Sequence, residues 1–84
     1  MPANNHSTTL SSIKDLGTAI RSARKAMHLR QSEAAMLCGV GVRFLSDLEN
    51  GKDTVRLGTA LKVVSGLGLA LSIGARPPSW EANG

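Results

Sequence analysis

The stretch from Leu29 to Lys52, LRQSEAAMLCGVGVRFLSDLENGK, decides the fold of this 84-residue chain. It holds two short helical runs separated by Gly39, a residue type that readily adopts left-handed backbone angles and ends a helix. Glu33 lies in the first turn of the first run, where its carboxylate can accept from an uncapped amide. Val40 and Leu45 occupy the two positions of a hydrophobic staple at the start of the second run. Two short helices joined by a tight glycine turn are typical of a helix-turn-helix, although an ordinary helical hairpin has the same spacing.

The second helix of this pair, residues 42–50, has Leu45 and Leu48 facing inward. Its opposite side carries a row of polar side chains at helical spacing, namely Arg43, Ser46, Asp47 and Asn50. Arg43 can donate two hydrogen bonds to O6 and N7 of guanine, and Val42 can touch the methyl group of thymine. Such an exposed row is what a helix needs to read duplex DNA in the major groove. It therefore favours a DNA-binding helix-turn-helix over a plain hairpin.

Further polar residues of this region are candidates for DNA contacts. Ser46 can bond either a base or a phosphate. Asp47 would repel phosphates unless it accepts from a cytosine amino group or pairs with a basic neighbour. We expect phosphate contacts, which fix register without reading sequence, from Gln31, Lys52 and Arg56.

The chain before this stretch predicts a long amphipathic helix over residues 13–27. Ser12 followed by Asp15 three residues later is a typical helix start. Arg24 borders the apolar stripe of this helix, where an unpaired charge would be costly. Glu49 is its natural partner, so we predict a structural ion pair between Arg24 and Glu49.

The chain after this stretch predicts a further helix from residue 57 and then a change of period. Leu69, Leu71 and Ile73 alternate with smaller residues, which is the signature of a half-buried strand. No second strand is visible in the sequence. We therefore expect this strand to pair with its copy in a second subunit across a two-fold axis, giving a homodimer.

Composition favours a polyanionic partner, because ten Lys and Arg outnumber six Asp and Glu and the sequence pI is near 10.0. With one cysteine, Cys38, the chain has no internal disulfide, and its first residues lack the apolar core of a secretory signal. The longest apolar stretch, 57–73, falls short of the roughly 20 apolar residues that a membrane span needs. We expect a cytoplasmic protein, associated with the nucleoid when bound to DNA.

The sequence offers no catalytic constellation. His6 and His28 fall in a loose arm and an interhelical turn, away from any recognisable carboxylate or thiol group. Ligands for a metal are too few, and Cys38 is expected to be a small core residue. We therefore expect no enzyme activity, no cofactor and no metal. Single-stranded nucleic acid is a poor target because the chain has few aromatic residues for stacking.

These observations predict three segments. Residues 1–10 form an arm, residues 11–74 form an all-α DNA-binding and dimerisation domain of four to five helices with one short C-terminal strand, and residues 75–84 form a tail.

The stretch quoted at the start resembles the helix-turn-helix of the Xre and phage-repressor-like family, most specifically in its ending Leu48-Glu49-Asn50-Gly51-Lys52. The resemblance extends over about residues 13–73, and the strand after the last helix is similar to that of HipB-type antitoxins. It implies a lambda-repressor-like fold, repression of the protein's own operon, double-stranded operator DNA as partner, and binding of a HipA-type serine/threonine kinase toxin.

The resemblance also implies roles for individual residues. A tryptophan in the C-terminal tail, here Trp80, docks on the toxin, and Arg24 with Glu49 matches the family's internal salt bridge. Two positions depart from the family pattern, since Arg30 replaces the usual Thr or Ser cap and Phe44 replaces a small polar residue. Family positions that contact DNA are matched here by Gln31, Ser32, Val42, Arg43, Ser46 and Lys52.

Two alternatives to the antitoxin remain open at the level of sequence. One is a stand-alone regulator of the Xre family. The other is a protein-binding module that holds its partner through the C-terminal tail.

Overall fold

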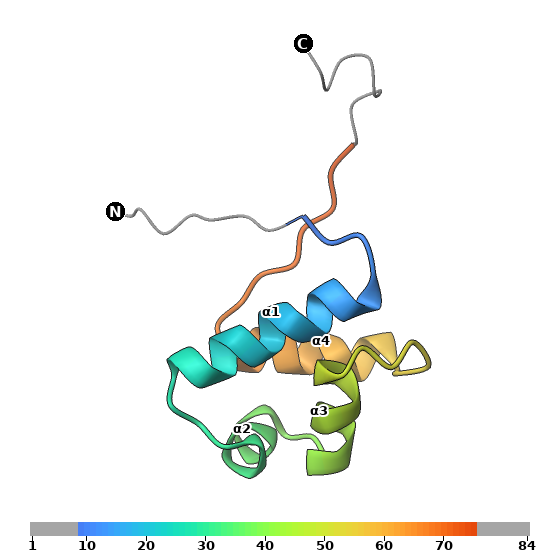
Figure 1. Cartoon of the computed structure of the whole chain (residues 1–84). Coiled ribbons are helices and arrows are strands. Elements are labelled where there is room, and N and C mark those ends of the chain that lie inside the picture. Colours follow the sequence, from blue (N-terminus) through green and yellow to red (C-terminus); the bar gives the residue numbers. More distant parts are fainter. Residues whose placement is uncertain (1–8, 76–84) are drawn as a thin grey trace, which may run out of the picture.

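The computed structural model describes residues 9–75, and this part of the chain folds into four helices (Figure 1). Most of the predicted arm and all of the tail beyond residue 75, including Trp80, lie outside the described residues. The helices are α1 (Ile13–Ala26), α2 (Gln31–Cys38), α3 (Val42–Glu49) and α4 (Leu57–Gly66).

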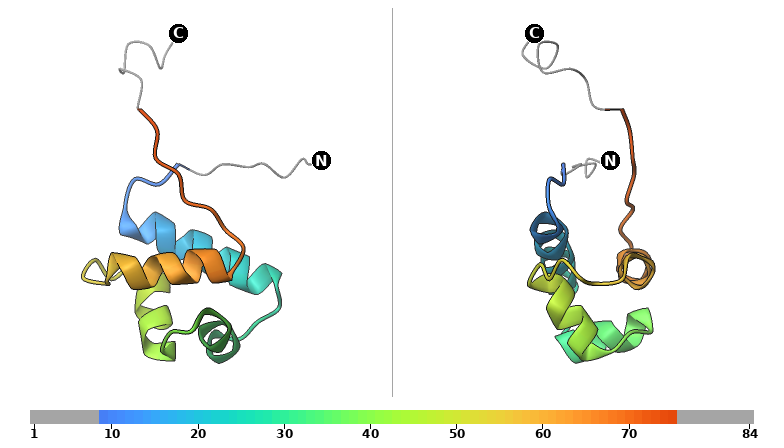
Figure 2. Two further views of the ribbon diagram at one scale, coloured as in Figure 1. Left: turned by 180° about the vertical axis from the view of Figure 1, so that it is seen from behind. Right: turned by 90° about the vertical axis from the view of Figure 1, so that its right-hand side faces the viewer.

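The helix-turn-helix is held on two supporting helices. α1 packs on α3, and α2 packs on both α3 and α4. α4 is seen end-on in the right-hand view of Figure 2, α1 is beside it at a slant, and α2 and α3 lie on one side of both. The arrangement is the predicted all-α helix-turn-helix fold, with four helices in the described residues.

The core gathers one residue or more from every helix. Ile20 of α1, Leu45 and Leu48 of α3, and Val63 of α4 are completely buried, and alanines of α2 close the space between them. Cys38 is buried too, as expected of a small core residue, and burial raises the pKa of its thiol. The leucines predicted to face inward from residues 42–50 therefore do so.

The helix ends follow local sequence signals. Ser12 is the N-cap of α1, and its hydroxyl accepts from the Asp15 amide at 3.4 Å. The carboxylate of Glu33 accepts from the Arg30 amide at 2.7 Å, as the sequence predicts. α1 ends one residue earlier than expected, because Met27 caps the helix, and its side chain is 44% exposed.

At two positions the backbone geometry requires glycine. Gly39 ends α2 with φ of 72°, a left-handed conformation that turns the chain into α3. Gly17 lies where α1 crosses α3, and a β-carbon there would clash with the carbonyl oxygen of Leu48. Close approach of the two helices at this point brings α1 within reach of the end of α3.

The turn between α1 and α2 is unusual because a histidine occupies its left-handed position. His28 has φ of 59°, its amide donates to the Lys25 carbonyl at 2.9 Å, and the Leu29 amide donates to the Arg24 carbonyl at 3.2 Å. This double closure is the pattern in which glycine is normally found. The turn is therefore tightly defined, and histidine is one of the few residue types other than glycine that is found at these angles with some frequency.

The C-terminal part of the described chain forms no strand. Residues 69–75 leave the end of α4 as an irregular segment that runs away from the four helices (Figures 1 and 2). Leu69 packs against the core, whereas Leu71 and Ile73 are exposed. The predicted strand would need a second chain to pair with, so it stays a prediction.

No helix in residues 9–75 combines the length and the apolar character that crossing a membrane requires.

Candidate nucleic-acid interface

A buried carboxylate at the end of α3 fixes how the helix-turn-helix sits on α1. Glu49 Oε2 accepts from Arg24 Nε at 2.7 Å, and Glu49 Oε1 accepts from Arg24 Nη2 at 2.9 Å. This is the ion pair predicted from the sequence, and its geometry is bidentate. The side chains of Glu49 and Arg24 are only 1% and 9% exposed.

The same two side chains also reach α2 and the turn before it. Arg24 Nη1 donates to the Leu29 carbonyl at 2.8 Å, and Gln31 Nε2 donates to Glu49 Oε1 at 3.1 Å. Three helices thus meet at one carboxylate, and Arg24 links the turn before α2 to it. We call Arg24, Leu29, Gln31 and Glu49 the Glu49 network.

Electrostatics favour the charged form of both partners. Burial alone would raise the pKa of the Glu49 carboxyl, but hydrogen bonds from Arg24 and Gln31, with the attraction of the Arg24 and Arg21 charges, outweigh it and lower that pKa. The hydrogen bond with Glu49 likewise raises the pKa of Arg24 despite the cost of burial. Both groups are therefore charged in the folded protein at neutral pH.

The outer side of α3 presents the row expected of a reading helix. Val42, 49% exposed, and Arg43 lie at its first turn, where a helix entering a groove meets base edges. Ser46 and Asp47, one turn later, are half-buried and so less accessible than a fully solvated row. Phe44, the departure from the family pattern, packs against the core.

Asp47 has a basic neighbour. Its carboxylate lies 3.6 Å from Lys52 Nζ, and the Lys52 amide donates to the Asp47 carbonyl at 3.0 Å. Of the two ways in which Asp47 avoids repelling phosphate, the structure therefore contains the ion pair. Pairing also holds the Lys52 ammonium beside the end of α3.

The remaining residues predicted to contact DNA lie at helix starts. Gln31 and Ser32 are the first two residues of α2, and Arg56 is the N-cap of α4. Ser32 and Arg56 are exposed, whereas Gln31 is half-buried and its side-chain amide donates to Glu49. The amide group of Gln31 is thus already engaged within the protein.

Sequence reasoning did not identify Arg21 as part of this region. Its Nε lies 3.9 Å from Glu49 Oε1, so a second arginine of α1 faces the same carboxylate. The spacing of Arg21 and Arg24, three residues apart in a helix, was the available signal that both lie on one side of α1.

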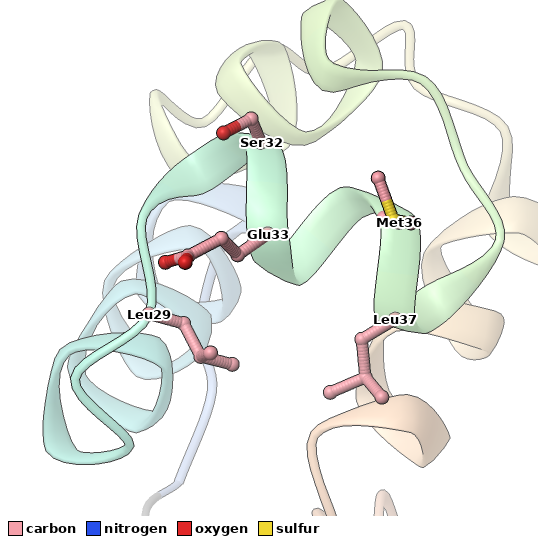
Figure 3. A pocket seen from close by; sticks show the side chains of 5 residues that line it. All are labelled: Leu29, Ser32, Glu33, Met36 and Leu37. Atoms are coloured by element: carbon pink, nitrogen blue, oxygen red, sulfur yellow. The ribbon is translucent and has the colours of Figure 1, made fainter.

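A shallow groove of about 390 Å³ runs along the outer face of α2 (Figure 3). Leu29, Met36 and Leu37 give it an apolar lining, and the carboxylate of Glu33 is engaged with the Arg30 amide. It lacks the convergent polar groups that orient a small molecule. Across residues 9–75, moreover, no three His, Cys, Asp or Glu side chains gather as they would around a metal ion.

The fold defines a helix-turn-helix protein, in which α3 occupies the position of the recognition helix. Comparison with known proteins leads to the same class. Residues 20–73 match the family model described as helix-turn-helix, and the chain belongs to this family of Xre-type transcriptional regulators.

Two relatives share nearly half of the aligned residues. The chain is 46% identical over 59 residues to the uncharacterized HTH-type transcriptional regulator y4mF of Sinorhizobium fredii, covering 70% of this chain and 78% of that protein. It is also 46% identical over 39 residues to the ImmF control region 10 kDa protein of Bacillus phage phi105, covering 46% of this chain and 43% of that protein.

Solved structures of HipB have the same fold. The chain matches a structure of the HipA-HipB-O2-O3 complex with a TM-score of 0.76 and 25% identity, covering 84% of this chain and all of that one. A HipB-O1-O2 complex matches with a TM-score of 0.75 and 26% identity, covering 82% of this chain and all of that one. The likeness to HipB-type proteins inferred from the sequence is thus confirmed.

Acid should weaken the fold through Glu49. Because the folded protein holds its pKa below the ordinary value of 4.5, the stabilisation is complete above that value and is lost as the pH falls through the lower folded pKa. Urea unfolding between about pH 7 and about pH 3 measures this loss. Glu49→Gln should be less stable at neutral pH by roughly 3–5 kcal/mol, since it leaves the Arg24 charge buried without its partner.

Asp53→Asn, at an exposed carboxyl, is the matched control and should keep the acid sensitivity of the unaltered protein. Equal acid sensitivity in Glu49→Gln and in the unaltered protein would contradict the assignment to Glu49.

Proposed function

We propose that this protein is a transcriptional repressor that binds a specific duplex operator through α3. The supporting observation is the exposed row at the start of α3, held in a fixed orientation by the Glu49 network. Arg43 reads guanine, Val42 contacts a thymine methyl group, and Ser46 bonds a base or a phosphate. Asp47 acts mainly by holding Lys52, which with Gln31, Ser32 and Arg56 contacts the DNA backbone.

Arg30, which replaces the usual Thr or Ser cap of the family, affects how the protein contacts the DNA backbone. Arg30 is the N-cap of α2 without a side-chain hydrogen bond to the helix, so its cationic side chain is exposed beside amides that attract phosphate. Gln31 uses its side-chain amide on Glu49, which leaves its backbone amide for phosphate. The contact pattern of this chain therefore relies on backbone groups and on Arg30 where a relative would use a capping hydroxyl.

We propose further that the protein is the antitoxin of a HipBA-like module, which represses its own operon and binds a HipA-type kinase. Support comes from HipB, whose solved structures share this fold and include the HipA-HipB-O2-O3 complex. The tail residue Trp80 is proposed as the contact to the kinase and lies outside the described residues. A stand-alone Xre regulator would share the DNA-binding surface but would not bind a kinase. Acting on an operator and on a kinase toxin places the protein in the bacterial cytoplasm.

The working unit is proposed to be a homodimer joined through residues 69–73. Ile73 is 99% exposed and Leu71 is 42% exposed, which leaves apolar surface for a partner to cover. A groove of about 570 Å³ adjoins this segment, between Leu69 and the outer face of α1 at Ala19, Ser22 and Ala23. The single chain thus carries both an uncovered apolar segment and an unfilled groove.

A two-fold axis would bring the exposed apolar segment of one subunit against the groove of the other. If Leu71 pairs with its own copy in an antiparallel ribbon, Leu69 lies opposite Ile73 of the second subunit on the same face. The Ile73 side chain is then directed into the groove that Leu69 lines. The two recognition helices of such a dimer would read half-sites about one DNA turn, roughly 34 Å, apart.

Removing the guanine contact tests the reading role of α3. Arg43→Ala should weaken binding to the upstream DNA of the protein's operon by roughly 1–3 kcal/mol and relax preference at one base pair of each half-site. Gel shifts on that DNA and on an unrelated duplex measure both effects. Arg43→Lys, which keeps the charge but loses the bidentate geometry, should recover non-specific binding only. Unchanged affinity and preference in Arg43→Ala would reject the role.

A charge in the proposed ribbon tests the dimer. Ile73→Asp should give monomers in light scattering and weaker operator binding, because the carboxylate would be buried against Leu69 of the second subunit. Met36→Asp is the matched control, since Met36 is 83% exposed on α2, away from the proposed ribbon, and should leave the dimer intact. Dimers of Ile73→Asp as stable as those of the unaltered protein would refute this interface.

Truncation tests the proposed kinase partner. The product of the neighbouring gene should co-purify with the full chain and be lost when the chain ends before Pro77, while DNA binding is retained. Trp80→Ala in the full chain should weaken the same complex. If neither the full nor the truncated chain retains a partner, the antitoxin proposal fails and the repressor proposal stands.

A further inference from the structure

The positive charge of Arg21 is not neutralised by the carboxylate of Glu49 beside it. Its Nε lies 3.9 Å from Glu49 Oε1, which is an ion-pair distance but too long for a hydrogen bond. Both oxygens of Glu49 already accept from Arg24, and Oε1 also accepts from Gln31. One carboxylate faces two guanidinium groups here, so a positive charge is left over.

Arg21 is also the accessible member of this group. Its side chain is 53% exposed, whereas the side chains of Arg24 and Glu49 are 9% and 1% exposed. Turning the Arg21 guanidinium outward removes no hydrogen bond from Glu49 and leaves the Arg24 pair in place. The movement therefore costs little stability, because an ion pair with a half-exposed member contributes little.

The position of Arg21 is at the edge of the proposed DNA surface. Arg21 Nε and Gln31 Nε2 lie 3.9 Å and 3.1 Å from the same oxygen atom, so the guanidinium and the first residue of α2 flank one carboxylate. Ser32, the exposed next residue of α2, is among the proposed backbone contacts. A planar guanidinium with its spare charge at this edge matches the geometry and charge of a phosphate.

We propose that Arg21 is an additional contact to the DNA backbone, which pairs with a phosphate beside the start of α2. The contact extends the DNA surface from the helix-turn-helix onto α1. It is independent of base sequence because Arg21 lies on a supporting helix, away from the row that reads base edges. The proposal rests on the proposed DNA-binding function.

Salt titration of DNA binding tests the contact. Full-length protein and its Arg21→Gln, Arg21→Lys and Lys25→Gln variants are titrated with the upstream duplex and with an unrelated duplex between roughly 50 and 200 mM salt. Lys25 is a matched control, since it is an exposed cation one turn farther along α1. Thermal unfolding of each variant is measured in parallel.

Arg21→Gln should bind both duplexes more weakly by a similar factor, about three- to tenfold, and the slope of log affinity against log salt should fall by about one for each bound subunit. Arg21→Lys should restore the slope, and Lys25→Gln should match the unaltered protein. The unfolding temperature of Arg21→Gln should stay at that of the unaltered protein.

The proposal is overturned if Arg21→Gln keeps the full slope, or if Lys25→Gln loses as much of it. A clear fall in the unfolding temperature of Arg21→Gln also overturns it, because Arg21 would then support the fold through Glu49. Failure of the unaltered protein to bind either duplex at any salt concentration would instead reject the DNA-binding function itself.

Discussion

The buried carboxylate of Glu49 is the constraint on which the arrangement of the helices depends. It is the last residue of α3, and its two oxygens receive hydrogen bonds from α1 and from the first residue of α2. Apolar packing alone is not directional, so Ile20, Leu45 and Leu48 bury their surface without fixing the rotation of α3. A bidentate ion pair has one good geometry. The network therefore sets which side of α3 faces outward, and with it the direction in which Val42, Arg43, Ser46 and Asp47 point.

The same network joins the orientation of α3 to that of α2. Arg24 binds the Leu29 carbonyl in the turn before α2, and Gln31 binds Glu49 from the first turn of α2. Burying a charge pair gives little net stability, but removing one partner leaves an uncompensated charge. In this protein the main effect of the Arg24–Glu49 pair is therefore to fix the orientation of the helices. A rotation of α3 that aimed its row elsewhere would leave a buried arginine unpaired.

Local signals in the sequence predicted most of the fold. Gly39 predicted the turn between α2 and α3, Ser12 the start of α1, and Glu33 the cap of α2, because each acts within a few residues of its position. Contacts between distant residues were partly accessible: a charge beside an apolar stripe predicted the Arg24–Glu49 pair. Nothing local distinguishes Gln31, 18 residues before Glu49, from a solvated glutamine. The strand expected at 69–73 depends on a second chain, so a single chain neither forms nor excludes it.

The size of the domain explains why both a charge network and a second subunit are useful. A chain of 84 residues buries a small core, here closed by alanines and one cysteine as well as by leucine, isoleucine and valine. The apolar contacts of such a small core are too few to fix the orientation of the recognition helix by themselves. Ile73 and Leu71 lie outside that core, and covering them in a dimer would add apolar burial without enlarging the chain. The orientation of α3 would then depend on Glu49, and the additional stability of the fold would come from the partner subunit. The outer side of α3 would therefore not be needed to stabilise the fold.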